Sequence, residues 1–181
     1  MALKATIFKA EVQVSDMDRG YYASHSLTLA RHPSETDERM MVRLLAFCLY
    51  ASEDLRFGRG LSTEEEADLH EIDPTGRIEH WIDVGTPDPR GLRKACGRAG
   101  RVTVLSYGRT AAAWWQQHRE TLAVQQNLAV LLLPVDVTEA LAALASRSMQ
   151  VQCTLQDGLV WFTCGELTVE VVPERLLPLP A

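Results

Sequence analysis

The sequence predicts an α/β fold in which helices pack on a β-sheet and further β-hairpins lie near the two ends of the chain. Strand-like and helix-like patterns alternate through residues 89–148, an order that gives parallel neighbouring strands covered by helices. Alternation of apolar and polar residues with period two marks hairpins near both ends. The 181 residues are 46% hydrophobic and 23% charged, so we expect one domain spanning residues 1–181.

The first elements are a hairpin and a helix. Residues 2–14 and 21–29 alternate as strands, with a turn at residues 17–20 between them. The helix follows His32 and Pro33, with Ser34 as its expected N-cap and Asp37 in the capping-box position. Apolar residues at helical spacing then predict a buried face that ends near Ala51.

Two glutamates precede this apolar face. Glu38 stands three residues before Met41 and therefore extends the face towards the helix N-terminus, and Glu35 lies one turn earlier on the same side. Both acids can simply complement the helix dipole. The functional alternative is that one of them is presented from the helix towards the acidic face of the second hairpin, at residues 66–85.

Residues 66–85 predict a second hairpin that carries acids on one face. The turn at residues 73–76, Asp-Pro-Thr-Gly, favours chain reversal. On the return arm Glu79, Trp81 and Asp83 share a face. Pairing Asp73 with Gly76 places Asp68 opposite Trp81, diagonal to Glu79 and Asp83. These carboxylates can converge on one divalent ion, or they can form a solvated face. The tryptophan among them indicates a partly covered face.

The remaining elements alternate between helix and strand. A helix capped by Thr86 or Asp88 begins near Pro89 and carries four basic residues, Arg90, Arg93, Lys94 and Arg98. We expect the following elements in order: a strand at 101–107, a helix at 109–121, a strand at 127–134, a helix at 136–148, and a hairpin at 149–172 with turns at 156–158 and at Gly165, before a tail from Pro173 onwards.

Composition narrows the class of protein. The net charge of −6 argues against nucleic acid as a partner, but sixteen of the eighteen Lys and Arg residues precede Glu120, so a basic face remains available. No signal peptide or membrane-spanning run is recognisable, and the four cysteines lack CxxC spacing, which favours reduced thiols in a cytoplasmic protein. No HExxH, GxGxxG, Walker or GxSxG pattern occurs, so zinc or an organic cofactor is not expected.

Several segments resemble the YaeQ family over nearly the whole chain. They are ARHPSET at 30–36, ERMM at 38–41, WIDVG at 81–85 and the Gln-Asp-Gly turn at 156–158. That family is largely uncharacterised in function. The resemblance implies a fold related to the PD-(D/E)XK nuclease superfamily, with a central mixed β-sheet and helices on both sides.

The resemblance also implies a set of site residues. Glu35 or Glu38 would be the acid from the helix, and Asp68 would be the acid from the first hairpin arm, with alanine where that motif has proline. The acid of the second arm would be Asp83, followed by glycine in place of the motif lysine, or Glu79, followed by Trp81 in that place. Lys94 could substitute for the absent lysine.

The implied chemistry is hydrolysis of phosphodiester bonds in nucleic acid, assisted by Mg²⁺ or Mn²⁺. Asp68 and Asp83 would bind the ion, and the arginines would contact phosphates. The alternative is a catalytically inactive protein with a nuclease fold that binds nucleic acid or protein. The arginines expected at the nucleic acid are Arg39, Arg90, Arg93 and Arg98.

Overall fold

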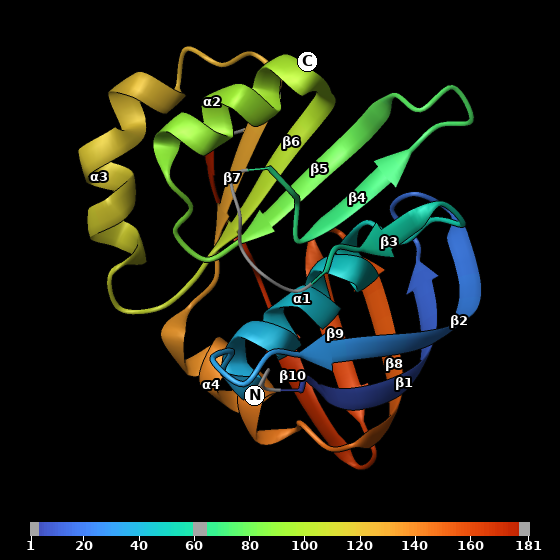
Figure 1. The fold of residues 1–181 in the computed structure, drawn as a ribbon. Coiled ribbons are helices and arrows are strands. Elements are labelled where there is room, and N and C mark those ends of the chain that lie inside the picture. The colour runs from blue at the N-terminus through green and yellow to red at the C-terminus, as the bar shows by residue number, and fades with distance from the viewer. Residues whose placement is uncertain (1–3, 60–64, 178–181) are drawn as a thin grey trace. The chain divides into compact units, whose positions relative to one another are not determined.

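The computed structural model describes residues 4–59 and 65–177. The described chain is an α/β fold with two mixed β-sheets and four helices, as Figure 1 shows. The α/β prediction is therefore confirmed, but the expectation of one central sheet is wrong, because the terminal hairpins form a sheet of their own. The described residues divide into two compact units: unit 1 comprises those within 1–51 and 136–173, and unit 2 comprises those within 52–135 and 174–181.

Unit 1 is built around a five-stranded sheet of order β10-β9-β8-β1-β2. Its central strands β1 and β8 are parallel, and the other pairs are antiparallel. Every residue from Met40 to Cys48 of α1 is buried, so this helix supplies much of the core of the unit. The elements are β1 (Thr6–Asp16), β2 (Tyr21–Arg31), α1 (Asp37–Leu49), α4 (Val135–Ala143, beginning at the boundary of the unit), β8 (Ser148–Gln156), β9 (Leu159–Cys164) and β10 (Leu167–Val171).

The first helix begins later than its sequence indicates. The N-cap is Thr36, whose hydroxyl accepts a hydrogen bond from the backbone N–H of Arg39 at 3.1 Å. The expected cap, Ser34, instead bonds through its hydroxyl to the ring nitrogen Nδ1 of His32 at 2.7 Å. Because that hydroxyl has a local partner, the next hydroxyl along the chain caps the helix.

Unit 2 contains a six-stranded sheet of order β11-β7-β6-β5-β4-β3. Strands β5, β6 and β7 are parallel, and β11, β4 and β3 join them antiparallel. The crossovers β5-α2-β6 and β6-α3-β7 proceed in one direction, so the right-handed rule places both helices on the same face, as in Figure 1. The elements are β3 (Leu55–Phe57), β4 (Leu69–Ile72), β5 (Ile78–Val84), α2 (Pro89–Arg98), β6 (Ala99–Ser106), α3 (Ala111–Leu122), β7 (Leu128–Leu132) and β11 (Glu174–Leu177).

The tail does not simply trail away after Pro173, because β11 pairs with β7. The helix-covered face of this sheet carries a core of apolar side chains from strands and helices. The core residues include Trp81, Leu92, Ala95, Val102, Val104, Trp115, Leu122, Leu128 and Val130.

No described helix has both the length and the apolar composition needed to cross a membrane.

Candidate active site

The acidic hairpin of unit 2 is present, but its register differs from the prediction. Leu69 pairs with Ile82 and His70 with Trp81, so the return arm is shifted by two residues. One of the two extra residues lies in the turn, where the Asp73 N–H donates to the carbonyl oxygen of Arg77 and closes a three-residue loop. The other extra residue is Glu79, which forms a bulge in β5. Past the bulge the shift is even, so Leu69, His70 and Glu71 keep their predicted faces relative to the return arm, whereas the Ile72–Ile78 pair next to the turn is shifted by one residue.

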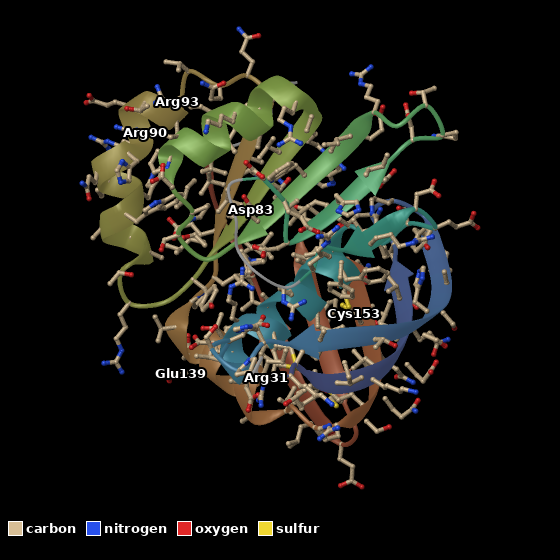
Figure 2. The ribbon with its side chains drawn as sticks, in the orientation of Figure 1. Arg31, Asp83, Arg90, Arg93, Glu139 and Cys153 are labelled. Carbon is tan, nitrogen blue, oxygen red and sulfur yellow. The ribbon has the colours of Figure 1, made fainter. Side chains whose placement is uncertain are left out.

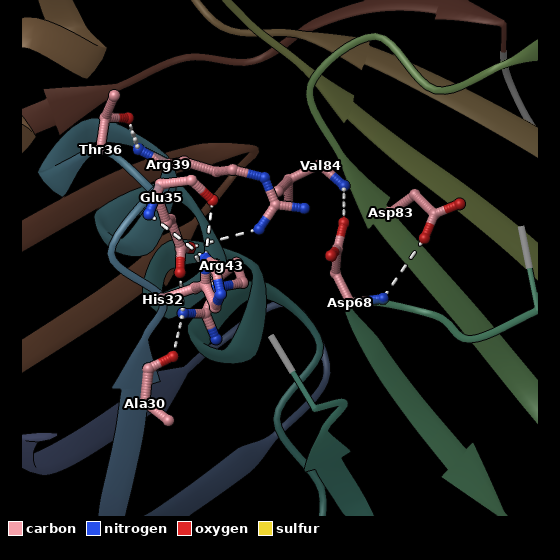
Figure 3. Close-up of polar contacts among 10 residues, drawn as sticks. Ala30, His32, Glu35, Thr36, Arg39, Arg43, Asp68, Asp83 and Val84 are labelled. Carbon is pink, nitrogen blue, oxygen red and sulfur yellow. Dashed lines mark hydrogen bonds and ion pairs between the residues drawn. The ribbon is translucent and has the colours of Figure 1, made fainter. Parts of the chain in front are cut away.

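The shift places Asp68 across from Asp83, just beyond the last pair of the β4–β5 ladder. The backbone N–H of Asp68 donates to Asp83 Oδ1 at 3.3 Å. In return, Asp68 Oδ2 accepts from the backbone N–H of Val84 at 2.8 Å, as Figure 3 shows. Asp68 is buried, at 2% exposure, and Asp83 is half-buried. Reciprocal bonds between backbone and carboxylate thus hold the two acidic residues together where the paired strands end.

Strand β3 fixes the backbone of the first acid. Gly58 N–H donates to the carbonyl oxygen of Asp68 at 2.8 Å. A Cβ atom on Gly58 would lie 2.1 Å from the carbonyl oxygen of Ala67, a distance that no side chain can occupy. Sequence analysis missed this close approach. Its only sequence signal is the isolated glycine beside a short strand pattern, which is typical of close backbone contact.

Trp81 lies beside the acids and is buried in the helix-covered core, at 2% exposure. Its indole N–H donates to Asp83 Oδ2 at 3.0 Å. The guanidinium carbon of Arg98 lies over its ring, 5.4 Å from the ring centroid. The inference that this face is partly covered is therefore confirmed. Trp81 connects the second hairpin acid with the basic helix.

Glu79 and Gly85 occupy the alternative motif positions. Glu79 is exposed and lies 3.6 Å from Arg77, measured from carboxylate oxygen to guanidinium nitrogen. It is four residues from Asp83, roughly 13 Å along a strand, so the two acids cannot share one ion through adjacent positions. Gly85 has a φ of 93°, which a lysine would rarely adopt. The absent lysine therefore reflects a backbone that turns at this point.

Helix α2 carries the predicted basic residues. Asp88 caps it by accepting from the backbone N–H of Arg90 at 2.7 Å, so one of the two expected caps is confirmed. All four basic side chains are exposed, and Arg90 and Arg93 can be followed in Figure 2. An open depression of about 840 Å³ brings two of them together. Its lining residues are Glu65, Lys94, Gly97 and Arg98.

In unit 1, the predicted helix acid Glu35 forms a buried ion pair that sequence analysis missed. Arg43 donates from Nε to Glu35 Oε1 at 2.7 Å and from Nη2 to Oε2 at 2.9 Å, as drawn in Figure 3. Arg39 adds a bond to Oε1 at 3.2 Å. The side chains of Glu35 and Arg43 are 3% and 1% exposed. The available signal was an arginine within an apolar helical stripe, which requires a partner.

Glu38 has a different environment in the same unit. Its Oε1 accepts from the hydroxyl of Thr138 at 2.7 Å. Glu35, Glu38 and Arg39 belong to unit 1, whereas Asp68, Glu79, Asp83, Lys94 and the other arginines belong to unit 2. Within the described ranges, no three His, Cys, Asp or Glu side chains form a cluster that could hold a metal ion. The assignments of these residues as catalytic or metal-binding therefore stay predictions.

Comparison with known proteins identifies the class and then the family. The two mixed sheets and four helices of the described residues define an α/β protein, with a pair of acidic residues at the end of a hairpin ladder. The chain belongs to the YaeQ family, because the family model described as YaeQ protein matches residues 1–173. The predicted resemblance to this family is therefore confirmed.

Curated relatives and solved structures agree with this membership. "Uncharacterized protein YaeQ" of Salmonella typhi is 46% identical over 172 residues, covering 94% of this chain and 95% of the relative. The protein of the same description from Escherichia coli K12 is 45% identical over the same shares. The crystal structure of YaeQ from Xanthomonas axonopodis pv. citri has a TM-score of 0.93 at 49% identity, covering 97% of this chain and 99% of that one. The structure from Pseudomonas syringae has a TM-score of 0.92 at 37% identity, with shares of 96% and 97%.

Proposed function

We propose that this chain is a Mg²⁺-dependent hydrolase that cleaves phosphodiester bonds in nucleic acid, with Mn²⁺ able to replace Mg²⁺. The observation that carries the proposal is the acid pair Asp68 and Asp83, joined by a hydrogen bond of 3.3 Å from backbone to carboxylate. The relation to the PD-(D/E)XK nuclease superfamily that the YaeQ resemblance implies is a second argument for it.

The donor set fits the ion. Mg²⁺ prefers hard oxygen ligands and is usually bound by one or two protein carboxylates, with water and phosphate oxygens completing the shell. Asp68 and Asp83 would supply those two carboxylates. When bound, the ion lowers the pKa of a coordinated water and stabilises charge on the phosphate.

The basic helix supplies the second requirement. Lys94 and Arg98 line one depression, and Arg98 stacks on the tryptophan that bonds to Asp83. We assign Lys94 to stabilising negative charge on the phosphate. Arg98 contacts a phosphate beside it, and Arg90 and Arg93 contact phosphates farther along the strand, which gives affinity without sequence readout.

A second candidate function is a nucleic-acid-binding module without catalysis. The reciprocal bonds between Asp68 and the second arm favour it, because they extend the hairpin ladder past its last backbone pair. In that role the two acids stabilise the sheet, and the glycine at position 85 in place of the motif lysine is of no consequence. Binding would then depend on the basic face of α2 alone.

The first test is thermal stability with and without Mn²⁺ or Mg²⁺. A protein that binds the ion only when folded gains stability as the metal concentration exceeds the dissociation constant. We expect a rise in melting temperature at millimolar metal that Asp83→Asn and Asp68→Asn abolish. The matched control is Asp54→Asn, the same chemical change at an exposed acid of the same unit, which should keep the full rise. If millimolar metal leaves the melting temperature of the wild-type protein unchanged, the proposed metal site is refuted.

The second test separates the two candidate functions. Cleavage of labelled DNA and RNA is measured with metal, and binding is measured by anisotropy in a chelator. The hydrolase predicts metal-dependent cleavage that falls at least about 100-fold in Asp83→Asn, equivalent to about 2.7 kcal/mol. The binding module predicts undiminished binding without cleavage. If all four basic residues of α2 contact phosphates, the logarithm of affinity for duplex DNA falls with the logarithm of salt with a slope of about −3.6.

A further inference from the structure

Trp81 makes a hydrogen bond that sets it apart from a tryptophan that only fills space. A buried indole N–H normally finds an acceptor, as that of Trp114 does at the carbonyl oxygen of Pro87, 3.1 Å away. Trp81 instead donates to the carboxylate of Asp83, two residues along the same strand, at 3.0 Å. Bonds to a charged acceptor are about twice as strong as neutral ones.

The two oxygens of this carboxylate are held by different donors. Oδ2 accepts from Trp81, and Oδ1 accepts from the backbone N–H of Asp68. The two bonds together fix both the rotation of the carboxylate and its place beside Asp68. A carboxylate has about four lone-pair sites, so accepting two N–H bonds is compatible with binding a cation.

The ring of Trp81 is itself immobilised. It is 2% exposed in the core that also contains Leu92, Val104 and Trp115, and Arg98 lies over it. An indole buried in this core beneath Arg98 cannot follow Asp83 if that side chain rotates. The hydrogen bond therefore keeps Asp83 in one orientation at no further cost in side-chain entropy.

We propose that Trp81 is a positioning residue for cation binding, which holds Asp83 in the orientation that lets it share an ion with Asp68. This inference rests on the proposed function, because it requires that the acid pair binds a divalent ion. It adds that the N–H group of the indole contributes to metal affinity, separately from any contribution of the packing of the ring.

The test removes the N–H group and keeps the ring. Benzothienylalanine at position 81 replaces the indole N–H with sulfur inside the same fused bicycle, so packing is retained. Mn²⁺ binding is measured by isothermal titration calorimetry on the full chain. We expect the dissociation constant for Mn²⁺ to be roughly tenfold higher than in the wild type, which is the effect of losing one hydrogen bond to a charged group. Trp81→Phe should weaken binding at least as much.

The matched control is Trp115→Phe, which makes a cavity in the same core at a tryptophan whose indole has no hydrogen bond within the described residues. It should change Mn²⁺ affinity less than twofold. Wild-type affinity in the benzothienylalanine variant would overturn the positioning role while leaving the metal site intact. Absence of Mn²⁺ binding by the wild-type protein would overturn the metal site and this inference together.

Discussion

Two buried hydroxyls on β6 provide a test of how polar groups are satisfied in unit 2. Ser106 is fully buried, and its Oγ has no hydrogen-bond partner among the described residues. Thr103 is 1% exposed, and its hydroxyl lies 2.8 Å from Nε2 of His80. Arg101 donates to Nδ1 of the same ring at 2.9 Å, so neutral His80 carries its proton on Nε2 and donates it to Thr103.

The substitutions Ser106→Ala and Thr103→Val should therefore change stability in opposite directions. A buried polar group without a partner costs about 1–3 kcal/mol. Removing the Ser106 oxygen leaves a void of roughly 15 Å³, which costs about 0.4 kcal/mol. We expect Ser106→Ala to raise the free energy of unfolding by about 1 kcal/mol. Thr103→Val removes the hydroxyl that accepts from the imidazole N–H and should lower it by about 1–2 kcal/mol.

The assay is urea unfolding followed by circular dichroism for the wild type and both variants. At a urea slope of about 2 kcal/mol per M, Ser106→Ala should move the midpoint up by about 0.5 M without changing the slope. Thr103→Val, three residues away on the same strand, should move it down. A loss of stability in Ser106→Ala comparable to that in Thr103→Val would refute the reasoning, because it would mean that the serine hydroxyl has a partner.

Three further predictions concern backbone space, acid stability and thiol reactivity. Gly58→Ala should lower the free energy of unfolding by about 3 kcal/mol, because its Cβ would meet the carbonyl oxygen of Ala67 at 2.1 Å, whereas Gly97→Ala, in open space on a helix, should raise it by about 0.5–1 kcal/mol in the same urea assay. Hydrogen bonds from the Thr75 hydroxyl and from the turn backbone lower the pKa of Asp73 below its ordinary value, so its stabilising contribution is complete above about pH 5 and is lost as the pH falls through the native pKa. Acid unfolding monitored by circular dichroism should then show a shallower loss of stability below pH 4 in Asp73→Asn than in the wild type. Burial raises the pKa of the Cys96 thiol to about 11, so the native protein should react with iodoacetamide at this residue at pH 8 far more slowly than the urea-unfolded chain, as measured by mass spectrometry.

The sequence predicts local features of the site well because they depend on short-range rules. Period-two alternation places Trp81 and Asp83 on one face of β5, and a register error of two residues leaves that result unchanged. The cap of α2 is narrowed to Thr86 or Asp88 because each is a side-chain acceptor that precedes a proline near the helix start, and Asp88 is the one that caps it. These assignments require no knowledge of distant residues.

Long-range features could not be predicted in the same way. The parallel pairing of β1 with β8 joins residues about 140 positions apart, and neither strand carries a pattern that selects the other. The bulge at Glu79 likewise lies in the pairing of β4 with β5, where Glu71 pairs with His80 but Ile72 with Ile78, and no local sequence pattern marks it. The turn could close with a two- or a three-residue loop, and the observed loop contributes the other half of the register shift.

The choice between Glu35 and Glu38 as the acid from the helix can be argued from charge. Two guanidinium groups already compensate Glu35, whereas the one bond of Glu38 in the described chain comes from a neutral hydroxyl. Glu38 is therefore the better candidate for a functional acid, and Glu35 the better candidate for a structural one. Glu35→Gln should lower the free energy of unfolding by about 3–5 kcal/mol, because it leaves the buried Arg43 without its counter-charge. Glu38→Gln keeps an acceptor for its hydroxyl donor and should cost about 1 kcal/mol or less. If urea unfolding shows that both variants lose the same free energy of unfolding, the distinction between a structural and a functional glutamate is refuted.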